Sequence, residues 1–107
     1  MPTVEKLRAS VPELVADVVL YPASKGGKRS NAYPGWGCVC MLSNTPPWVG
    51  YDGWPMLGET PLEPGTKQRL GFVFLAGATA AEILRNARHF FLWEGRVIGE
   101  ADVVVGS

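Results

Sequence analysis

His89 is the only histidine of the 107-residue chain, so acid–base or nucleophilic chemistry would have to be built around it. A serine-type triad needs a nucleophile and an orienting carboxylate beside the imidazole. Ser30, Asp52 and Asp102 are available, but no motif or spacing links any of them to His89. The two phenylalanines that follow His89 favour a packed or surface histidine on a strand. We therefore predict no catalytic residues.

The two cysteines, Cys38 and Cys40, are separated by one residue on a predicted strand. Side chains at i and i+2 of a strand share a face, which is poorly suited to an unstrained disulfide between them. A Cys-x-Cys pair also lacks the Cys-x-x-Cys spacing of common zinc sites. We expect buried free thiols in a reducing cytoplasm, with no metal and no cofactor.

The dipeptide Gly27-Lys28 resembles part of a phosphate-binding loop, but the rest of that motif is missing. The motif requires a glycine six positions before the lysine and a serine or threonine directly after it, and here Pro22 and Arg29 occupy those two places. We predict a solvated turn at this point and no bound GTP.

A small basic cluster, Lys25, Lys28 and Arg29, lies close in sequence to Tyr33 and Trp36. Phosphate contacts from basic side chains, combined with base stacking on aromatic rings, are typical of single-stranded nucleic-acid binding. Three charges give modest affinity, and a solvated turn is the favoured explanation of these charges alone. RNA binding through the Lys28/Arg29 turn is therefore the alternative hypothesis.

Residues 45–55 form a proline- and glycine-rich stretch that carries Trp48, Tyr51 and Trp54. Trp and Tyr are enriched at binding hot spots, and an exposed loop that presents them is a plausible protein-docking platform. In the competing interpretation the two tryptophans fold back and plug one end of a small core. The sequence leaves both interpretations open.

Length and composition indicate a single globular domain. The hydrophobic content is 47%, and ten basic residues balance ten acidic ones. A neutral chain has no overall field that would draw it to nucleic acid or to an anionic membrane. No apolar run approaches the length of a membrane span, and the N-terminus lacks the apolar core of a signal peptide, so we expect a cytoplasmic protein.

The elements that must position these residues are short strands separated by turn signals. Residues 1–14 are expected to form an N-terminal extension with a short helix, and residues 15–107 a β-domain. Spacing of apolar residues, together with Gly, Pro and capping signals, predicts the remaining elements. These are strands at 15–21, 36–42 and 68–76, a short strand near 56–57, a helix at about 79–86 that begins with a Thr79 capping box, and a closing hairpin.

The hairpin turns at Glu94-Gly95-Arg96 and continues in a strand that alternates strictly. One face is predicted to carry Val97, Gly99, Ala101, Val103 and Val105, and the other Arg96, Ile98, Glu100, Asp102 and Val104. Such a sequence of strands is typical of an antiparallel barrel or sandwich.

Three segments resemble the third domain of translation elongation factor Tu. Residues 26–36 read Gly-Gly-Lys-Arg-Ser-Asn-Ala-Tyr-Pro-Gly-Trp, residues 62–67 read Leu-Glu-Pro-Gly-Thr-Lys, and residues 94–99 read Glu-Gly-Arg-Val-Ile-Gly. The last resembles the family's final hairpin, although it is one glycine shorter. The resemblance covers about residues 16–105 and implies a small closed antiparallel six-stranded β-barrel with one or two short helical segments.

By position, the resemblance carries the family's tRNA-contacting places onto Lys28, Arg29, Glu94 and Gly95. The nucleotide chemistry of the family belongs to a different domain and is not implied here. We therefore expect a non-enzymatic binding module that engages another protein through Trp48, Tyr51 and Trp54. RNA binding is the alternative, and a small hydrolase-like enzyme is the third hypothesis.

Overall fold

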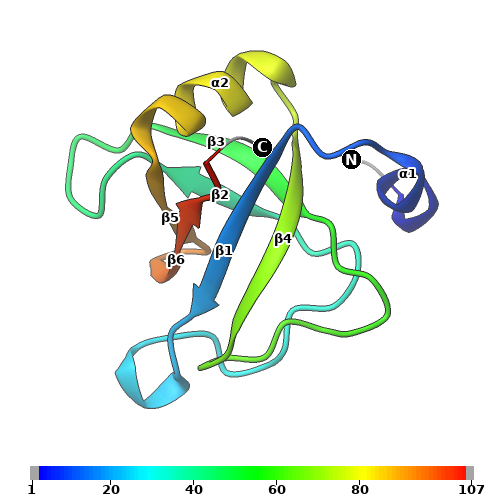
Figure 1. Ribbon diagram of the computed structural model, residues 1–107. Coiled ribbons are helices and arrows are strands. Elements are labelled where there is room, and N and C mark those ends of the chain that lie inside the picture. The colour runs from blue at the N-terminus through cyan, green and yellow to red at the C-terminus, as the bar shows by residue number, and fades with distance from the viewer. Residues whose placement is uncertain (1–2, 106–107) are drawn as a thin grey trace.

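A computed structural model describes residues 3–105 and shows six strands arranged as a closed antiparallel barrel in the order β1-β4-β3-β2-β5-β6 (Figure 1). The strands are β1 (Leu14–Leu20), β2 (Cys38–Met41), β3 (Gly50–Pro55), β4 (Lys67–Phe74), β5 (His89–Trp93) and β6 (Val97–Val103). The helical segments are α1 (Val4–Ala9), the 3-10 turn η1 (Ala23–Lys25) and α2 (Ala78–Ala87). The predicted small closed six-stranded barrel is confirmed.

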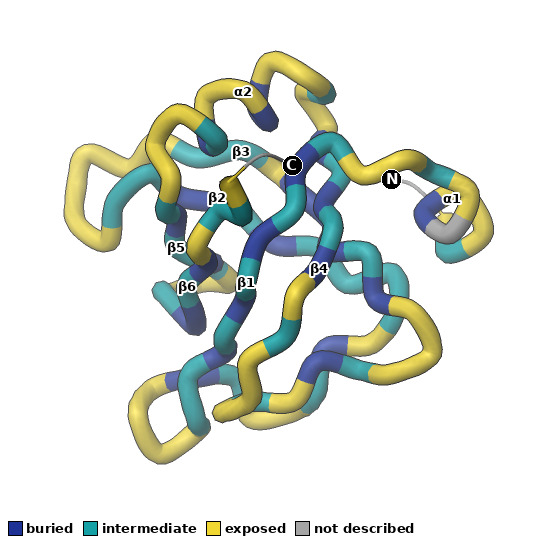
Figure 2. Tube along the Cα trace, viewed as in Figure 1, coloured by how far each residue is buried: buried dark blue, intermediate teal, exposed yellow. Residues whose placement is uncertain are grey.

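Alternation of apolar side chains explains why the strands form and which way they face. Along β1 every second residue is buried, from Leu14 to Leu20, and Figure 2 shows dark blue alternating with teal on this strand. Phe72 of β4 and Phe90 of β5 meet edge to face in the interior, with ring centroids 5.5 Å apart. A barrel of this size is filled by side chains, so its interior is core and not a channel.

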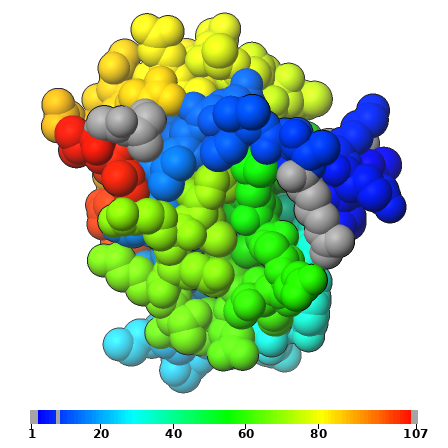
Figure 3. Space-filling view, turned by 45° about the vertical axis from the view of Figure 1, so that its right-hand side comes forward, coloured from blue at the N-terminus to red at the C-terminus, as the bar shows by residue number. Residues whose placement is uncertain are grey.

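Helix α2 packs on one end of the barrel. Ala80, Ala81 and Leu84 are buried in the same hydrophobic cluster as the strand residues. In the space-filling view this yellow helix covers the top of the molecule, while the blue α1 segment projects at one side (Figure 3). The capping-box prediction at Thr79 is wrong: the N-cap is Gly77, which has a φ of 66° and no side-chain capping bond. In the turn after β4 the Gly77 N–H donates to the Phe74 carbonyl at 3.0 Å, and the helix starts at Ala78, so Thr79 lies inside its first turn.

The closing hairpin turns at Gly95, which has a positive φ of 75°. The strict alternation predicted for the last strand is wrong at Ile98, because Ile98 and Gly99 are both buried. Leu92 pairs with Gly99 whereas Trp93 pairs with Val97, so Ile98 is the extra residue of a bulge and its side chain joins the core.

Element boundaries differ from prediction mainly around the aromatic stretch. Residues 50–55 form strand β3 instead of belonging to a loop, and residues 56–57 form no strand. Strand β1 begins at Leu14, one residue before the predicted start. Helix α1 ends at Ala9, before the proline at position 12, which cannot donate a backbone hydrogen bond.

Candidate functional site

Four outward residues form a row across the barrel wall. Asp52 of β3 is paired with Val39 of β2, which is paired in turn with Trp93 of β5. Leu75, directly after β4, extends the row on the other side, since its N–H donates to the Asp52 carbonyl at 3.0 Å. Paired residues on neighbouring strands share a face. The register alone therefore brings together Val39 and Trp93, which are 54 positions apart along the chain.

A groove of about 600 Å³ runs over this row. Its lining contains the small residues Gly37, Gly53 and Gly95, the apolar or aromatic residues Cys38, Val39, Trp54, Leu75 and Trp93, and the carboxylates of Asp52 and Glu94. A Cβ on Gly37 would collide with the Trp54 ring, whereas a Cβ on Gly53 would point into the barrel interior, toward Phe74 and Cys40. Among the described residues that line the groove, the charged side chains are the two carboxylates.

Trp54 forms part of the groove and is 6% exposed. A Cβ atom placed on Gly37 would lie 2.5 Å from Trp54 Nε1, so the pyrrole part of the indole packs directly against the Gly37 backbone. The prediction of Trp54 as an exposed loop anchor is wrong, because the residue is on strand β3 and is covered. It is also absent from the interior cluster, so it packs on the outside of the barrel and does not plug its end.

The other two predicted aromatics lie in different environments. Trp48 remains 44% exposed and stands against Trp93, with ring centroids 4.7 Å apart and a tilt of 51°. Tyr51 is paired with Cys40 and packs against the barrel interior. Trp93 was not among the predicted site residues. The sequence feature that could have identified it is the alternation along β5, which places His89, Phe91 and Trp93 on the outward face.

The hairpin turn joins the basic cluster through a compact arrangement of charged and aromatic groups. Lys28 Nζ lies 3.2 Å from Glu94 Oε1, and Trp36 Nε1 donates to Glu94 Oε2 at 2.7 Å. The same ammonium stands 5.8 Å from the centre of the Trp36 ring. Three of the residues predicted to bind RNA, Lys28, Glu94 and Gly95, are therefore close together, whereas Arg29 is exposed and takes no part in this arrangement.

Arg96 holds the glycine turn of residues 26–27 against the hairpin. Its Nε donates to the Gly26 carbonyl at 2.8 Å, and its Nη2 donates to the Gly27 carbonyl at 2.9 Å. A Cβ at Gly27 would overlap the carbonyl oxygen of Tyr21, so the position requires glycine for close packing. Gly27 thus serves the packing of the two turns, whereas Gly26 ends η1 with a positive φ of 82°.

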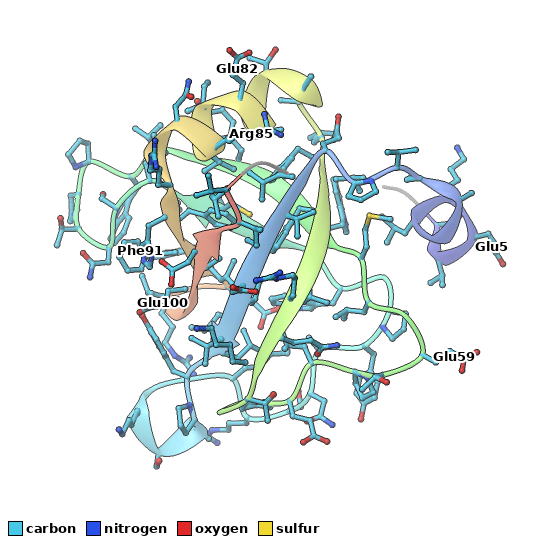
Figure 4. The ribbon with its side chains drawn as sticks, in the orientation of Figure 1. Glu5, Glu59, Glu82, Arg85, Phe91 and Glu100 are labelled. Atoms are coloured by element: carbon cyan, nitrogen blue, oxygen red, sulfur yellow. The ribbon has the colours of Figure 1, made fainter. Side chains whose placement is uncertain are left out.

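His89 does pair with a carboxylate, on a different part of the outer surface. His89 Nδ1 lies 2.7 Å from Asp102 Oδ1, and Nε2 lies 3.9 Å from a Glu100 oxygen. Phe91 and Glu100, labelled in Figure 4, come from the neighbouring strands β5 and β6 and are direct register partners. Among the described side chains, no hydroxyl or thiol is hydrogen-bonded to the imidazole, and neither Ser30 nor Asp52 forms a hydrogen bond or ion pair with it.

Tyr21 completes this second polar group by donating its hydroxyl hydrogen to Glu100 Oε2 at 2.5 Å. Burial and, after it, the bond to the Glu100 carboxylate raise the pKa of Tyr21 to about 12. Both effects favour the neutral phenol, because ionisation would place a second negative charge beside the carboxylate.

Cys38 and Cys40 are free and buried, and their predicted place on one face of a strand is confirmed. Burial raises the pKa of the Cys40 thiol well above its usual range, with a further contribution from a hydrogen bond with Cys38. The thiolate is the reactive form of cysteine, so this environment makes Cys40 a poor nucleophile. Across residues 3–105, no cluster of three or more His, Cys, Asp or Glu residues is arranged to hold a metal ion.

Comparison of the chain with protein-family models, with curated proteins and with solved structures found no match in any of the three. The helices of the described part of the chain are all too short or too polar to cross a membrane.

Proposed function

We propose that this protein is a non-enzymatic binding module that engages a partner protein through the groove over β2, β3 and β5. The observation that carries the proposal is the Trp48–Trp93 pair, which leaves aromatic surface exposed beside a 600 Å³ depression. Val49 and Leu75 add further exposed apolar surface, at 45% and 69%. Exposed aromatic anchors beside a concave apolar surface are typical of protein-recognition sites.

The charges favour a protein over RNA as the partner. Lys28 is held by Glu94, and its side chain is only 16% exposed, so its charge is largely neutralised before any phosphate approaches. Of the two carboxylates in the groove, Glu94 is paired with Lys28, and the remaining charge of Asp52 repels a phosphate backbone. A role similar to that of the third domain of elongation factor Tu, with tRNA as ligand, is therefore the weaker proposal. The buried free thiols suit a reducing compartment such as the cytoplasm.

Photocrosslinking from the rim of the groove tests this proposal. A photoreactive amino acid replaces Leu75, which is exposed at the rim, and in a second variant it replaces Val11, which is 82% exposed and does not line the groove. We expect one defined protein of the source cell to crosslink from position 75 and not from position 11. The purified pair should then bind, and Leu75→Glu should abolish binding while Val11→Glu leaves it intact.

Equal crosslinking from both positions, or recovery of RNA in place of a protein from position 75, would contradict the proposal. Because Leu75 and Val11 are both exposed apolar side chains, the comparison separates a specific groove from general surface stickiness.

A further inference from the structure

The groove has a marked charge preference. Its two charged side chains are carboxylates, and the remaining lining within the described residues is aromatic, aliphatic, cysteine or glycine. Glu94 is already occupied by the Lys28 ammonium and the Trp36 indole. Asp52 differs: it is exposed, and no donor among the described side chains and backbone groups is bonded to its carboxylate. The groove thus offers one free negative charge to a ligand.

The position of Asp52 relative to the tryptophans defines what fits there. Asp52 and Trp93 occupy the same row with Val39 between them, so two strand spacings, roughly 10 Å, separate their backbones. Trp48 stands against Trp93 and limits how that ring can turn. A flat cationic group above Val39 would meet a carboxylate on one side and an indole on the other.

The neighbouring site shows the same combination filled from within the chain. Lys28 places its ammonium between the Glu94 carboxylate and the Trp36 ring, at 3.2 Å from the oxygen and 5.8 Å from the ring centre. Asp52 and Trp93 repeat this pairing of a carboxylate and an indole without a cation from the chain. Arginine suits the wider and more open arrangement better than lysine, because its planar guanidinium both stacks on indole and binds a carboxylate through two N–H groups.

We infer that the partner segment in the groove presents an arginine, whose guanidinium lies over Val39 between the Asp52 carboxylate and the Trp93 indole. This inference rests on the proposed function, since it specifies the chemistry of the protein that the same groove engages. The exposed Leu75 side chain, which lines the groove, then receives an aliphatic side chain beside the arginine, and Trp48 adjoins the groove through its contact with Trp93.

The test uses the full chain and a short peptide of defined chemistry. Acetyl-Leu-Arg-Leu-amide is titrated into ¹⁵N-labelled protein, and the indole N–H signals of Trp93, Trp48 and Trp36 are followed. The matched probe replaces arginine with citrulline, which has the same shape without the charge. We expect shifts at Trp93 and Trp48 with little change at Trp36, and an affinity about threefold to tenfold higher for the arginine peptide, as an exposed ion pair and a cation–π contact together provide.

Two variants test whether the preference for arginine over citrulline depends on the Asp52 carboxylate. Asp52→Asn should remove the advantage of arginine over citrulline, and because this carboxylate is exposed and unbonded, the fold should be unchanged. Glu59→Gln removes one negative charge from a loop remote from the groove, at the right of Figure 4, and should keep the preference. Equal affinity for the two peptides in the natural chain, or a preference that survives Asp52→Asn, would overturn the inference.

Failure of the inference and failure of the proposed function are distinguishable. If a partner crosslinks from position 75 and the arginine preference is absent, the groove binds a protein of different chemistry. If no partner crosslinks from position 75, the proposed function itself is wrong.

Discussion

Replacing Trp54 with alanine should destabilise the fold far more than the same change at Trp48. Trp54 is 6% exposed and rests against Gly37, whereas Trp48 is 44% exposed. A buried aromatic side chain removes about 150–250 Å² from water, and at about 25 cal/mol per Å² this is roughly 4–6 kcal/mol as an upper bound. Allowing for the surface that alanine retains, we expect Trp54→Ala to cost about 3–5 kcal/mol.

For Trp48→Ala the expected cost is about 1–2 kcal/mol, because about half of the ring is already in water and its main aromatic partner is Trp93. Equilibrium urea unfolding followed by circular dichroism measures both values. With a slope of about 2 kcal/mol per M, the midpoint should fall by about 1.5–2.5 M for Trp54→Ala and by about 0.5–1 M for Trp48→Ala. Equal midpoints for the two variants would refute the assignment of Trp54 as a structural wall and Trp48 as an accessible surface.

The remaining predictions concern the two turns and the tyrosine. Gly27→Ala should lower the free energy of unfolding by at least about 2 kcal/mol, because the new Cβ meets the Tyr21 carbonyl. Gly95→Ala should lower it by only about 1 kcal/mol, because Gly95 has open space around it and a φ of 75°. Thermal melts that rank the two variants in the opposite order would contradict this. In a spectrophotometric titration, one of the three tyrosines should ionise at about pH 12, and Tyr21→Phe should remove that step. Because the folded-state pKa is raised from 10.0, the stability contributed by neutral Tyr21 is complete below pH 10 and is lost as the pH rises toward 12, so the natural chain should lose more stability than Tyr21→Phe over that interval.

Local patterns were sufficient to predict much of the barrel. The alternation in β1 and around Phe72 and Phe74 indicates half-buried strands, and the Glu94-Gly95-Arg96 turn marks the closing hairpin. These features depend on residues within a few positions of one another, where backbone geometry and the period of a strand act directly. The bulge at Ile98 escaped prediction because it depends on how β6 is paired with β5, which a single strand does not reveal.

The amino-acid sequence by itself determined the alternating faces of β1 and β4 and the turn at Gly95, and it offered no recognisable catalytic motif. Only the tertiary structure decided which of its aromatic residues share a surface. The groove exists because the register of three strand pairs places Leu75, Asp52, Val39 and Trp93 in one row, and because Gly37 leaves room for the Trp54 ring. The pairing of His89 with Asp102 likewise follows from the β5–β6 register. Strand pairing is a property of the closed barrel as a whole, so contacts between distant segments emerge only once every strand has found its neighbours.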